Sequence, residues 1–327
     1  MHVLIECGSV IPAVKYGGTE RVVWWLGKAL VEQGHKVTYL AMPGSSCPFA
    51  DIIALDPARP RHEQIPDDVD IVHYNGGHDT LCPKPYLETI HGNVPPGHTF
   101  HINTVFISQN QAERCGGDYY IHHGLDLEEY GDPALQAPRQ NLVFLAKAAW
   151  RVKNVKGAIR MTRNAGAAIE VAGGSRLNIK MGFRFTATPK ARFHGMVDQQ
   201  YKMQLLRRTE GLVFPVLWHE PFGLAVIEAM YYGNPAFVTA WGSLPELVTP
   251  EVGFSSNSES ELTEAIKNRG AYKRDVIHEY IRENFNNHRM ASHYVQAYEK
   301  VLNGETLNSQ VPVKPDTPEP KRFSMTP

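Results

Sequence analysis

The sequence predicts an α/β protein built from two consecutive parallel sheets. Short apolar runs of strand length alternate with amphipathic segments of helix length, as in parallel strands joined by helical crossovers. The alternation is interrupted once, by the polar, proline-bearing segment Asp132–Arg139, and then starts again. The length of 327 residues suits two domains of ordinary size. We therefore expect two Rossmann-like domains whose ligand sites lie at the carboxyl ends of the strands, in a cleft between the domains.

The first domain is predicted at residues 1–138. Its first strand, Val3–Ile5, leads through a Gly/Pro loop to a helix at Thr19–Gln33, whose apolar residues recur at helical spacing. Thr19 suits the N-cap of this helix and Gly34 suits the position just after its end. Further strands are expected at His35–Leu40, Ile52–Leu55, Ile71–Tyr74, Tyr86–Ile90, Thr104–Ile107 and Tyr119–Ile121.

The second domain is predicted at residues 139–282, with a C-terminal helical segment at 283–302 that crosses back to the first domain. Helices are expected at Val155–Asn164 and Leu224–Tyr232, and a closing helix at Tyr294–Leu302. Strands are expected at Leu142–Ala146, Ala168–Ala172, Arg192–His194, Gly211–Pro215 and Pro235–Thr239. Residues 303–327 form a tail with five prolines in its last 17 residues and little to bury, so we predict that it is flexible.

Composition excludes several classes of protein. Lys and Arg number 33 against 34 Asp and Glu, and this balance argues against a dedicated nucleic-acid binder. No apolar run is long enough to span a bilayer, and the first residues do not resemble a signal peptide. The four cysteines show no metal-binding spacing and indicate free thiols in a reducing compartment: Cys7, Cys47, Cys82 and Cys115. We expect a cytoplasmic protein.

The strongest local pattern lies at residues 219–229. A helix beginning near Phe222 would place Glu220 in the preceding loop and Glu228 two turns into the helix. The backbone N–H groups of Phe222, Gly223 and Leu224 would then form an anion site, because the first N–H groups of a helix have no partner within it. Two carboxylates beside such a turn suit a ligand with both phosphate and hydroxyl groups. On spacing alone, a surface loop with a capping glutamate is the plainer interpretation.

The pattern E-x-F-G-x-x-x-x-E at Glu220–Glu228 resembles the signature of the retaining glycosyltransferases of family 4, which have the GT-B fold. Other segments resemble that family in the same order, and their order is more specific than any one of them. His123 stands where the family has Asn, and Ser243 stands where it has Gly. The segments are Ile11–Glu20 with Tyr16-Gly17-Gly18, Gly34-His35-Lys36-Val37, Thr89-Ile90-His91-Gly92, His123-Gly124-Leu125-Asp126 and Trp241–Glu246.

The resemblance implies a cationic clamp on a donor diphosphate, formed by an Arg after the first strand of the second domain and a Lys shortly beyond it. Here Lys147 stands at the Arg position, and Lys153 follows six residues later. Arg151 with Lys156, five residues apart, is the alternative pair, and a solvated basic face is the plain interpretation of the cluster.

The resemblance also implies the functions of the individual site residues. His91 would orient the donor sugar, Glu220 would hold its hydroxyls and Glu228 would hold the ribose. The implied catalytic residues are His91, Glu220, Lys147 and Lys153. The implied donor-binding residues are Gly17, Gly18, Arg151, Phe222, Gly223, Leu224 and Glu228.

The predicted function is that of a retaining glycosyltransferase with the GT-B fold. It would move a hexose from a nucleotide-diphosphate sugar, with UDP-glucose preferred, to a hydroxyl of a saccharide, lipid-linked or small-molecule acceptor. A lipid-linked acceptor would imply peripheral membrane association. We expect no cofactor and no metal, because Asp68-Val69-Asp70 precedes a strand, whereas a metal-binding D-x-D should end one.

Two alternatives remain open at this stage. The first is a nucleotide-sugar epimerase on the same fold. The second is a non-catalytic scaffold that binds a sugar or nucleotide, which the Lys147 substitution favours. A nicotinamide dehydrogenase is disfavoured, because no G-x-G-x-x-G opens a helix after a strand.

Overall fold

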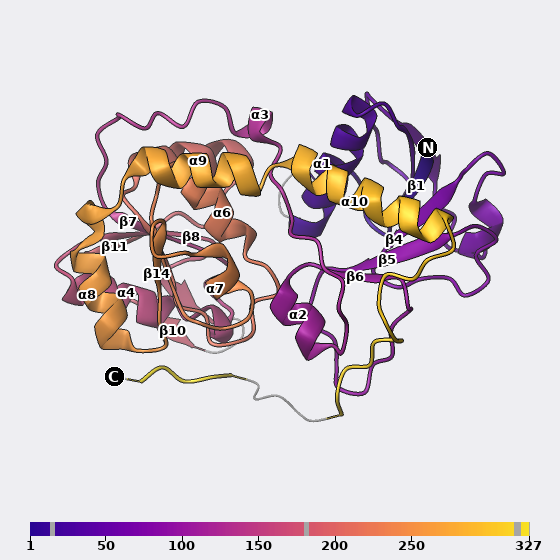
Figure 1. Ribbon diagram of the computed structural model, residues 1–327. Coiled ribbons are helices and arrows are strands. Elements are labelled where there is room, and N and C mark those ends of the chain that lie inside the picture. The colour runs from indigo at the N-terminus through magenta and orange to yellow at the C-terminus, as the bar shows by residue number, and fades with distance from the viewer. Residues whose placement is uncertain (14–16, 180–182, 317–321, 327) are drawn as a thin grey trace. The chain divides into compact units, whose positions relative to one another are not determined.

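The computed structural model describes residues 1–13, 17–179, 183–316 and 322–326 (Figure 1). The chain forms two compact units. Met1–Leu127 and Phe285–Glu319 make up the first, which we call the first domain. Glu128–Asn284 and Pro320–Pro327 make up the second domain. Tyr16 of the predicted glycine-rich loop and tail residues 317–321 and 327 lie outside the described ranges.

The first domain contains a six-stranded parallel sheet in the order β3-β2-β1-β4-β5-β6. This is the Rossmann order, and the strand order reverses between β1 and β4. All six residues of β1 are buried, as expected for a central parallel strand. The strands are β1 (His2–Cys7), β2 (Lys36–Ala41), β3 (Asp51–Ala54), β4 (Ile71–Asn75), β5 (Tyr86–Ile90) and β6 (Thr104–Phe106).

Two long helices of the first domain pack against each other, α1 (Gly18–Glu32) and α10 (Asn287–Leu302) (Figure 1). The N-cap of α1 is Gly17 rather than Thr19. The side chain of Asn286 accepts a hydrogen bond from Arg289 N and caps α10, so this helix begins seven residues before the predicted one. Two short helices complete the domain, η1 (Arg61–Gln64) and α2 (Gln109–Arg114).

The second domain repeats the topology of the first, with a parallel sheet in the order β11-β8-β7-β12-β13-β14. Its strand order reverses between β7 and β12. A separate antiparallel hairpin consists of β9 (Leu177–Asn178) and β10 (Arg184–Phe185). The parallel strands are β7 (Leu142–Leu145), β8 (Ile169–Ala172), β11 (Ala191–Phe193), β12 (Leu212–Phe214), β13 (Ala236–Val238) and β14 (Gly253–Ser255).

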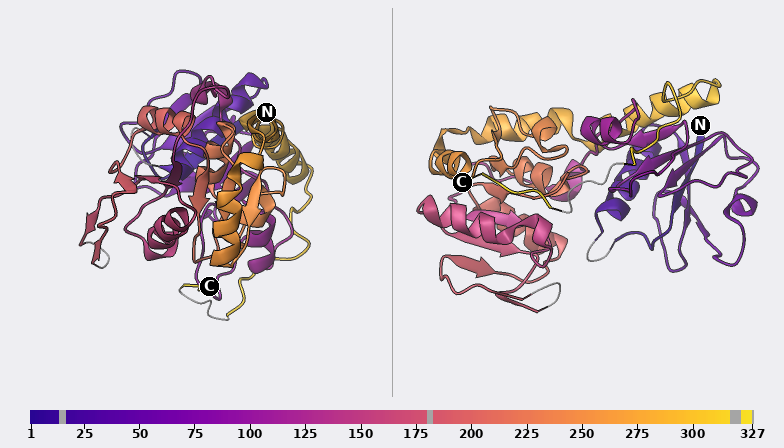
Figure 2. Two further views of the ribbon diagram at one scale, coloured as in Figure 1. Left: turned by 90° about the vertical axis from the view of Figure 1, so that its left-hand side faces the viewer. Right: turned by 90° about the horizontal axis from the view of Figure 1, so that it is seen from below.

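Helices cover both faces of the second sheet (Figures 1 and 2). α4 (Val155–Asn164) packs with α8 (Glu259–Lys267) on one face, and α6 (Leu224–Tyr231) packs with α9 (Arg274–Asn284) on the other. The remaining helical elements of this domain are η2 (Arg151–Lys153), α5 (Gln199–Arg208), α7 (Leu244–Leu247) and η3 (Arg269–Ala271). No helix in the described ranges is both long and apolar enough to cross a membrane.

The chain passes to the second domain at residue 128, before the predicted division at residue 138. Residues 128–138 pack with the second domain, starting within α3 (Leu127–Tyr130). The buried Tyr130 hydroxyl donates to Glu228, and Arg274 donates to the carbonyls of Leu135 and Ala137. These contacts join residues distant in sequence, so the proline-bearing composition of the segment could not indicate them.

The predicted strand at Tyr119–Ile121 is wrong. Only a single bridge forms there, between Phe106 and Tyr120. Tyr119 O accepts from Phe106 N, and Ile121 N donates to Phe106 O. The bridge falls on Phe106, the last residue of β6.

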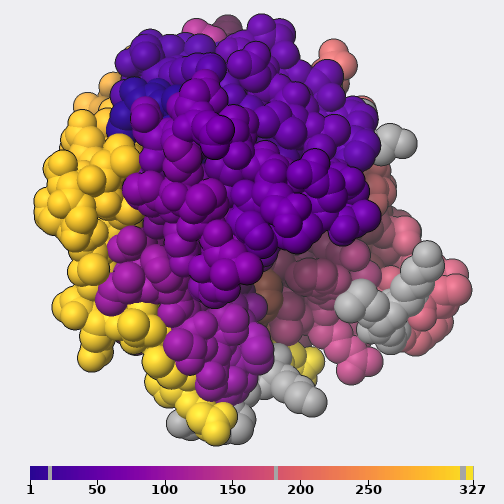
Figure 3. All heavy atoms as spheres, turned by 90° about the vertical axis from the view of Figure 1, so that its right-hand side faces the viewer, coloured from indigo at the N-terminus to yellow at the C-terminus, as the bar shows by residue number. Residues whose placement is uncertain are grey.

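The prediction of a flexible tail is wrong for residues 303–316, which lie along the first domain (yellow in Figure 3). Asn308 is buried, and its amide nitrogen donates to the carbonyls of Ile102 and Thr104. Phe100 N donates to Pro312 O, and Lys314 N donates to His98 O. Backbone and amide hydrogen bonds therefore hold this segment, together with the buried Leu307 and Pro312.

Candidate functional site

The candidate residues of the second domain gather at the carboxyl ends of β7 and β12, where the strand order reverses. Ligands of doubly wound sheets bind at this kind of position. The loop after β7 contains Lys147, Arg151 and Lys153, and the loop after β12 contains Glu220. The two loops are joined by a hydrogen bond of 2.7 Å from Leu217 N to Val152 O.

Lys153 and Glu220 form a largely buried ion pair at this edge. The distance from Lys153 Nζ to Glu220 Oε2 is 2.6 Å, and the two side chains are only 12% and 10% exposed. Trp218 Nε1 donates to the same oxygen at 2.7 Å, and Lys153 Nζ lies 4.7 Å from the Trp218 ring centroid. Glu220 Oε1 accepts no hydrogen bond from any residue that the structure describes. That oxygen can therefore accept from a ligand hydroxyl.

The backbone of Glu220 is held by the segment that follows β13. Gly242 has a φ of +70°, and a Cβ atom there would lie 2.3 Å from Glu220 O. Only glycine fits this close approach without strain. Ser243 N donates to Glu220 O at 3.0 Å, and the Ser243 hydroxyl donates to the same carbonyl. Ser243, which departs from the family pattern, therefore helps to position Glu220.

The start of α6 agrees with the predicted helix at Leu224–Tyr232 and differs from the start near Phe222 that the predicted anion site assumed. The helix begins at Leu224, and Gly223 is its N-cap, with a φ of +105° in the left-handed region. Phe222 and Gly223 precede the helix, so Leu224 alone of the three predicted donors belongs to its first turn. The Phe222 side chain is buried and serves packing. The predicted anion site at this turn stays a prediction, with the Leu224 N–H as its donor inside the helix.

Glu228 is buried on α6 and is held by two residues from other elements. The Tyr130 hydroxyl donates to Glu228 Oε1 at 2.7 Å, and the Lys202 ammonium of α5 forms an ion pair with the same oxygen. Both contacts reach Oε1, so the partners fix the carboxylate while leaving Oε2 for a further donor. A buried charge of this kind requires a partner, which Lys202 supplies.

The other cations of the loop after β7 have different surroundings. Lys147 Nζ lies 5.3 Å from the centroid of the Trp150 ring. Arg151 and Lys156 line a separate cavity, together with Trp150. Among the described residues, neither Lys147, Arg151 nor Lys156 forms an ion pair, in contrast to Lys153.

The candidate histidine of the first domain follows β5. His91 Nε2 lies 2.8 Å from Asn75 Oδ1, and Asn75 Nδ2 donates to Glu6 O. Its ring stacks on His123, with ring centroids 5.2 Å apart. Burial lowers the pKa of His91 to about 4, so the imidazole is neutral at pH 7 and can act only through hydrogen bonds. His123, the second departure from the family pattern, therefore contacts the predicted catalytic histidine directly.

His91 lines a cavity of 460 Å³ at the carboxyl ends of β4 and β5, together with Asn75, His78 and Glu88. The His78 ring contacts Glu88 at 2.8 Å, and Thr104 donates to the other Glu88 oxygen at 2.6 Å. The first-domain cavity therefore has a lining of hydrogen-bonding side chains.

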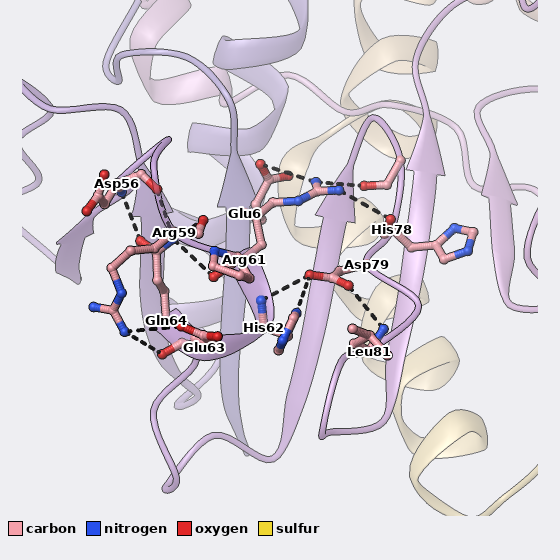
Figure 4. A network of polar contacts seen from close by, with 12 residues as sticks. Glu6, Asp56, Arg59, Arg61, His62, Glu63, Gln64, His78, Asp79 and Leu81 are labelled. Carbon is pink, nitrogen blue, oxygen red and sulfur yellow. Dashed lines mark hydrogen bonds and ion pairs between the residues drawn. The ribbon is translucent and has the colours of Figure 1, made fainter.

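A polar network around Arg61 shapes the loop that borders this cavity (Figure 4). Arg61 donates to the carbonyls of Gly77 and His78 at 3.0 and 3.2 Å, and it lies 3.8 Å from Glu6 Oε1. Burial raises the pKa of Glu6, and the Arg61 charge opposes this rise. Arg61 thus joins the end of β1 to the loop after β4.

The predicted glycines Gly17 and Gly18 lie at the start of α1. A Cβ atom on Gly17 would lie 2.5 Å from Glu20 Oε2. The glycine therefore allows the Glu20 carboxylate to approach the helix start closely. No described group of three or more His, Cys, Asp and Glu side chains is arranged to hold a metal ion.

Comparison with known proteins finds a similarity within the second domain. A family model for "Glycosyl transferases group 1" matches residues 135–270, which contain β7–β14 and the Lys153–Glu220 pair. Residues 135–270 are therefore similar to this family over about two fifths of the chain. No curated protein matches the chain at a significant level.

Solved structures resemble nearly the whole chain. AviGT4, a glycosyltransferase involved in avilamycin A biosynthesis, is 21% identical, with a TM-score of 0.76 over 93% of this chain and 99% of that one. The catalytic domain of starch synthase IV from Arabidopsis thaliana, bound to ADP and acarbose, is 14% identical (TM-score 0.68; 92% and 99% covered). Anabaena Alr3699/HepE in complex with UDP-glucose is 14% identical (TM-score 0.64; 92% and 100% covered). This chain has the GT-B glycosyltransferase fold.

The sequence motifs of this GT-B protein located the carboxylates but not the side chains that position them. Tyr130 and Lys202 hold Glu228, Trp218 holds Glu220, and Asn75 holds His91. Trp218 is the one that the sequence could have indicated, because it lies two residues before Glu220. The others come from elements 16 to 98 residues away, and no local pattern marks them.

Proposed function

We propose that this protein is a retaining glycosyltransferase that moves a hexose from a nucleotide-diphosphate sugar to an acceptor hydroxyl without a metal. The buried Lys153–Glu220 pair, at the edge where the second sheet reverses its order, carries the proposal. It combines a cation for a diphosphate with a carboxylate oxygen open to a sugar hydroxyl. UDP-glucose is the preferred donor, because the HepE protein that shares this fold was solved with UDP and with UDP-glucose.

The proposed chemistry is a displacement on one face of the sugar. The acceptor oxygen forms a bond to the anomeric carbon as the bond to the diphosphate breaks, and the departing phosphate oxygen takes the acceptor proton. Negative charge grows on the diphosphate, so a preorganised cation stabilises the transition state more than the ground state. In the proposal Lys153 and Lys147 supply that charge, and Glu220 Oε1 accepts from the sugar hydroxyls.

The nucleotide is proposed to contact Glu228. Because Tyr130 and Lys202 fix Oε1, the other carboxylate oxygen would accept hydrogen bonds from the ribose diol. His91 is proposed to contact the donor sugar as a neutral hydrogen-bonding group, which fits its lowered pKa. The acceptor is proposed to be a saccharide, a lipid-linked or a small-molecule hydroxyl, and membrane association is proposed only for the lipid-linked case.

A single assay tests the reaction class. The protein is incubated with UDP-glucose and a panel of acceptors in the presence of EDTA. Released UDP is quantified, and the product is analysed by mass spectrometry and by the anomeric proton coupling in NMR. We expect UDP and glucosylated product in equal amounts, with the α configuration of the donor retained.

Other outcomes of that assay contradict the proposal in distinct ways. A β product excludes retention. A more than tenfold loss in EDTA that manganese restores excludes a metal-independent reaction. Conversion of the nucleotide sugar without any acceptor identifies an epimerase, and UDP binding without turnover of any nucleotide sugar identifies a binding scaffold.

A further inference from the structure

The second domain contains a cavity of 340 Å³ that is lined by none of the residues Lys147, Lys153, Glu220 and Glu228. It lies beside the loop after β7 and the β9–β10 hairpin. Its described lining residues include four cations and no carboxylate: Arg151, Lys156, Arg184 and Arg322. Like charges gathered around one cavity raise its positive potential, so the cavity attracts an anion.

Arg184 is the most unusual member of this wall. Arg184 is only 6% exposed, and its Nη2 donates a hydrogen bond to Ser175 O at 2.8 Å. Nε and Nη1 are buried and have no hydrogen-bond partner within the described ranges. Arg176 of the same hairpin differs, because its Nη1 donates to the carbonyls of Thr186 and Thr188. A buried guanidinium with two unused donors is costly unless a ligand accepts from it.

Arg322 comes from the C-terminal segment 322–326, which is anchored on the same domain. Phe323 N donates to Leu217 O at 2.8 Å, and the Phe323 ring stacks on Trp241 with centroids 4.2 Å apart. Thr326 N donates to Asn257 O at 2.9 Å. These contacts hold Arg322 at the cavity, where its exposed side chain forms no ion pair with any described residue.

We propose that this cavity binds a phosphate-bearing ligand through Arg184 and Arg322. A phosphate group has more acceptor oxygens than a carboxylate. It is therefore the better match for a cavity with several guanidinium donors. The volume of 340 Å³ admits more than one phosphate group, and Trp150 and Phe183 add aromatic surface to the wall. The phosphate can come from the donor diphosphate or from a separate phosphorylated molecule. With the donor diphosphate as its ligand the site rests on the function proposed above, and with a separate phosphorylated molecule it is independent of that function.

Calorimetric titration with inorganic pyrophosphate tests the site. Wild-type protein is compared with Arg184→Gln, Arg322→Gln and the control Arg192→Gln, which removes an exposed arginine of β11 that does not line the cavity. We expect both cavity variants to bind pyrophosphate at least tenfold more weakly, and the control to bind as the wild type does. Affinity should also fall as NaCl rises from 50 to 200 mM, since the contacts are ionic.

Arg184→Gln removes a buried side chain, so its folding is checked by thermal unfolding. If it does not fold, Arg322→Gln decides the test, because Arg322 is exposed. The proposal is overturned if pyrophosphate does not bind at millimolar concentration, or if all folded variants bind it equally.

A second titration, in saturating UDP, identifies the source of the phosphate. Loss of pyrophosphate binding would identify the donor diphosphate as the ligand, and simultaneous binding would identify a separate phosphorylated molecule. Both results support the site. A failure of the proposed function can be told apart from a failure of this site. Glu228→Gln should weaken the binding of UDP, but it should leave pyrophosphate binding at Arg184 and Arg322 unchanged.

Discussion

Two buried histidines of the first domain are kept neutral by their surroundings. His73 Nδ1 contacts the Tyr298 hydroxyl at 2.7 Å, and its Nε2 contacts Thr89 Oγ1 at 2.8 Å. Burial lowers the pKa of His73 to about 3 and that of His91 to about 4. The ring nitrogens of His73 therefore join the sheet to α10 through hydrogen bonds that protonation would disturb.

The lowered histidine pKa values predict a loss of stability on acidification. The unfolded chain binds these protons near pH 6.5, whereas the folded protein resists them until pH 4 or below. The free energy of unfolding should thus be fully retained above pH 6.5. As the pH decreases from 6.5 to 4, each of these histidines should lower the free energy of unfolding by up to about 1.4 kcal/mol for every pH unit. The raised pKa of Glu6 opposes this trend, but it is one group against several histidines, including His123.

Urea unfolding at pH 7.0, 5.5 and 4.5 measures this dependence. Carboxyls with lowered pKa, such as Glu88, add to the loss only below about pH 4.5, so the upper part of the range reports the histidines. His73→Gln should be less stable at pH 7 but should show a flatter dependence. Equal stability of the wild type at pH 7.0 and 5.5 would contradict the buried neutral state.

The Lys153–Glu220 pair leads to a prediction about turnover. Lys153→Ala should lower kcat on the order of 100-fold, with a smaller change in the KM for the donor, because the charge acts mainly on the developing diphosphate. Lys147→Arg should keep or improve activity, since arginine restores the bidentate donor of the family pattern. Lys267→Ala, which removes an exposed lysine of α8, serves as the control.

Several outcomes discriminate between the possible clamps. Wild-type turnover in both Lys147→Ala and Lys153→Ala, with losses in Arg151→Ala and Lys156→Ala, would assign the diphosphate to the alternative pair. If all four variants are active, the cluster is a solvated face. Thermal unfolding of Lys153→Ala separates a catalytic loss from the structural effect of leaving the Glu220 carboxylate without its ion pair.

At the scale of the elements, the sequence predicted the central strands well, because each is a short, nearly continuous apolar run. Tyr86–Ile90 is confirmed to the residue, and the other predicted parallel strands that form agree within one or two residues, whereas β14 was not predicted. The prediction omitted α5, α8 and α9. Each of these helices buries only two apolar residues, so the apolar pattern is too narrow to identify them: Leu205 and Leu206, Leu262 and Ile266, and Ile277 and Ile281.

The candidate site was predictable where a motif is continuous in sequence. Glu220 and Lys153 lie in loops next to predicted elements and Glu228 lies within a predicted helix, and the structure brings Lys153 and Glu220 into contact. The surroundings of Gly223 were not predictable, because a Cβ atom there would lie 3.1 Å from Leu244, which comes from a different element. Contacts between residues far apart in sequence determine the local surroundings of such site residues.

The ordered part of the tail gives a prediction about stability. Asn308→Ala removes hydrogen bonds to four backbone groups, at residues 102, 104, 118 and 119, and leaves some of them buried. We expect it to lower the free energy of unfolding by about 1–3 kcal/mol, as measured by urea denaturation. Asn303→Ala, at an exposed position after α10, should change stability by less than about 0.5 kcal/mol. Equal effects of the two variants would indicate that the tail is only loosely attached.

At the scale of the whole molecule, the same topology occurs twice, and each copy brings candidate residues to the point where its strand order reverses. Glu6 and Asn75 lie at the ends of β1 and β4, and the loops with Lys153 and Glu220 follow β7 and β12. The alternation of strands and helices predicted this duplication. The position of the domain boundary depends on Tyr130, whose hydroxyl reaches a residue 98 positions away, so composition could not locate it.

The most direct test is whether the second domain holds a nucleotide diphosphate through Glu228. Calorimetric titrations with UDP, GDP and ADP compare the wild type with Glu228→Gln and with Glu251→Gln, which alters a fully exposed carboxylate of the same domain. We predict that the wild type binds at least one of the nucleotides. Glu228→Gln should weaken that binding by about 1.5–3 kcal/mol, roughly 10- to 150-fold in Kd, while Glu251→Gln has no effect. Absence of binding for all three nucleotides, or equal affinity in Glu228→Gln, would contradict a nucleotide-sugar site in this domain.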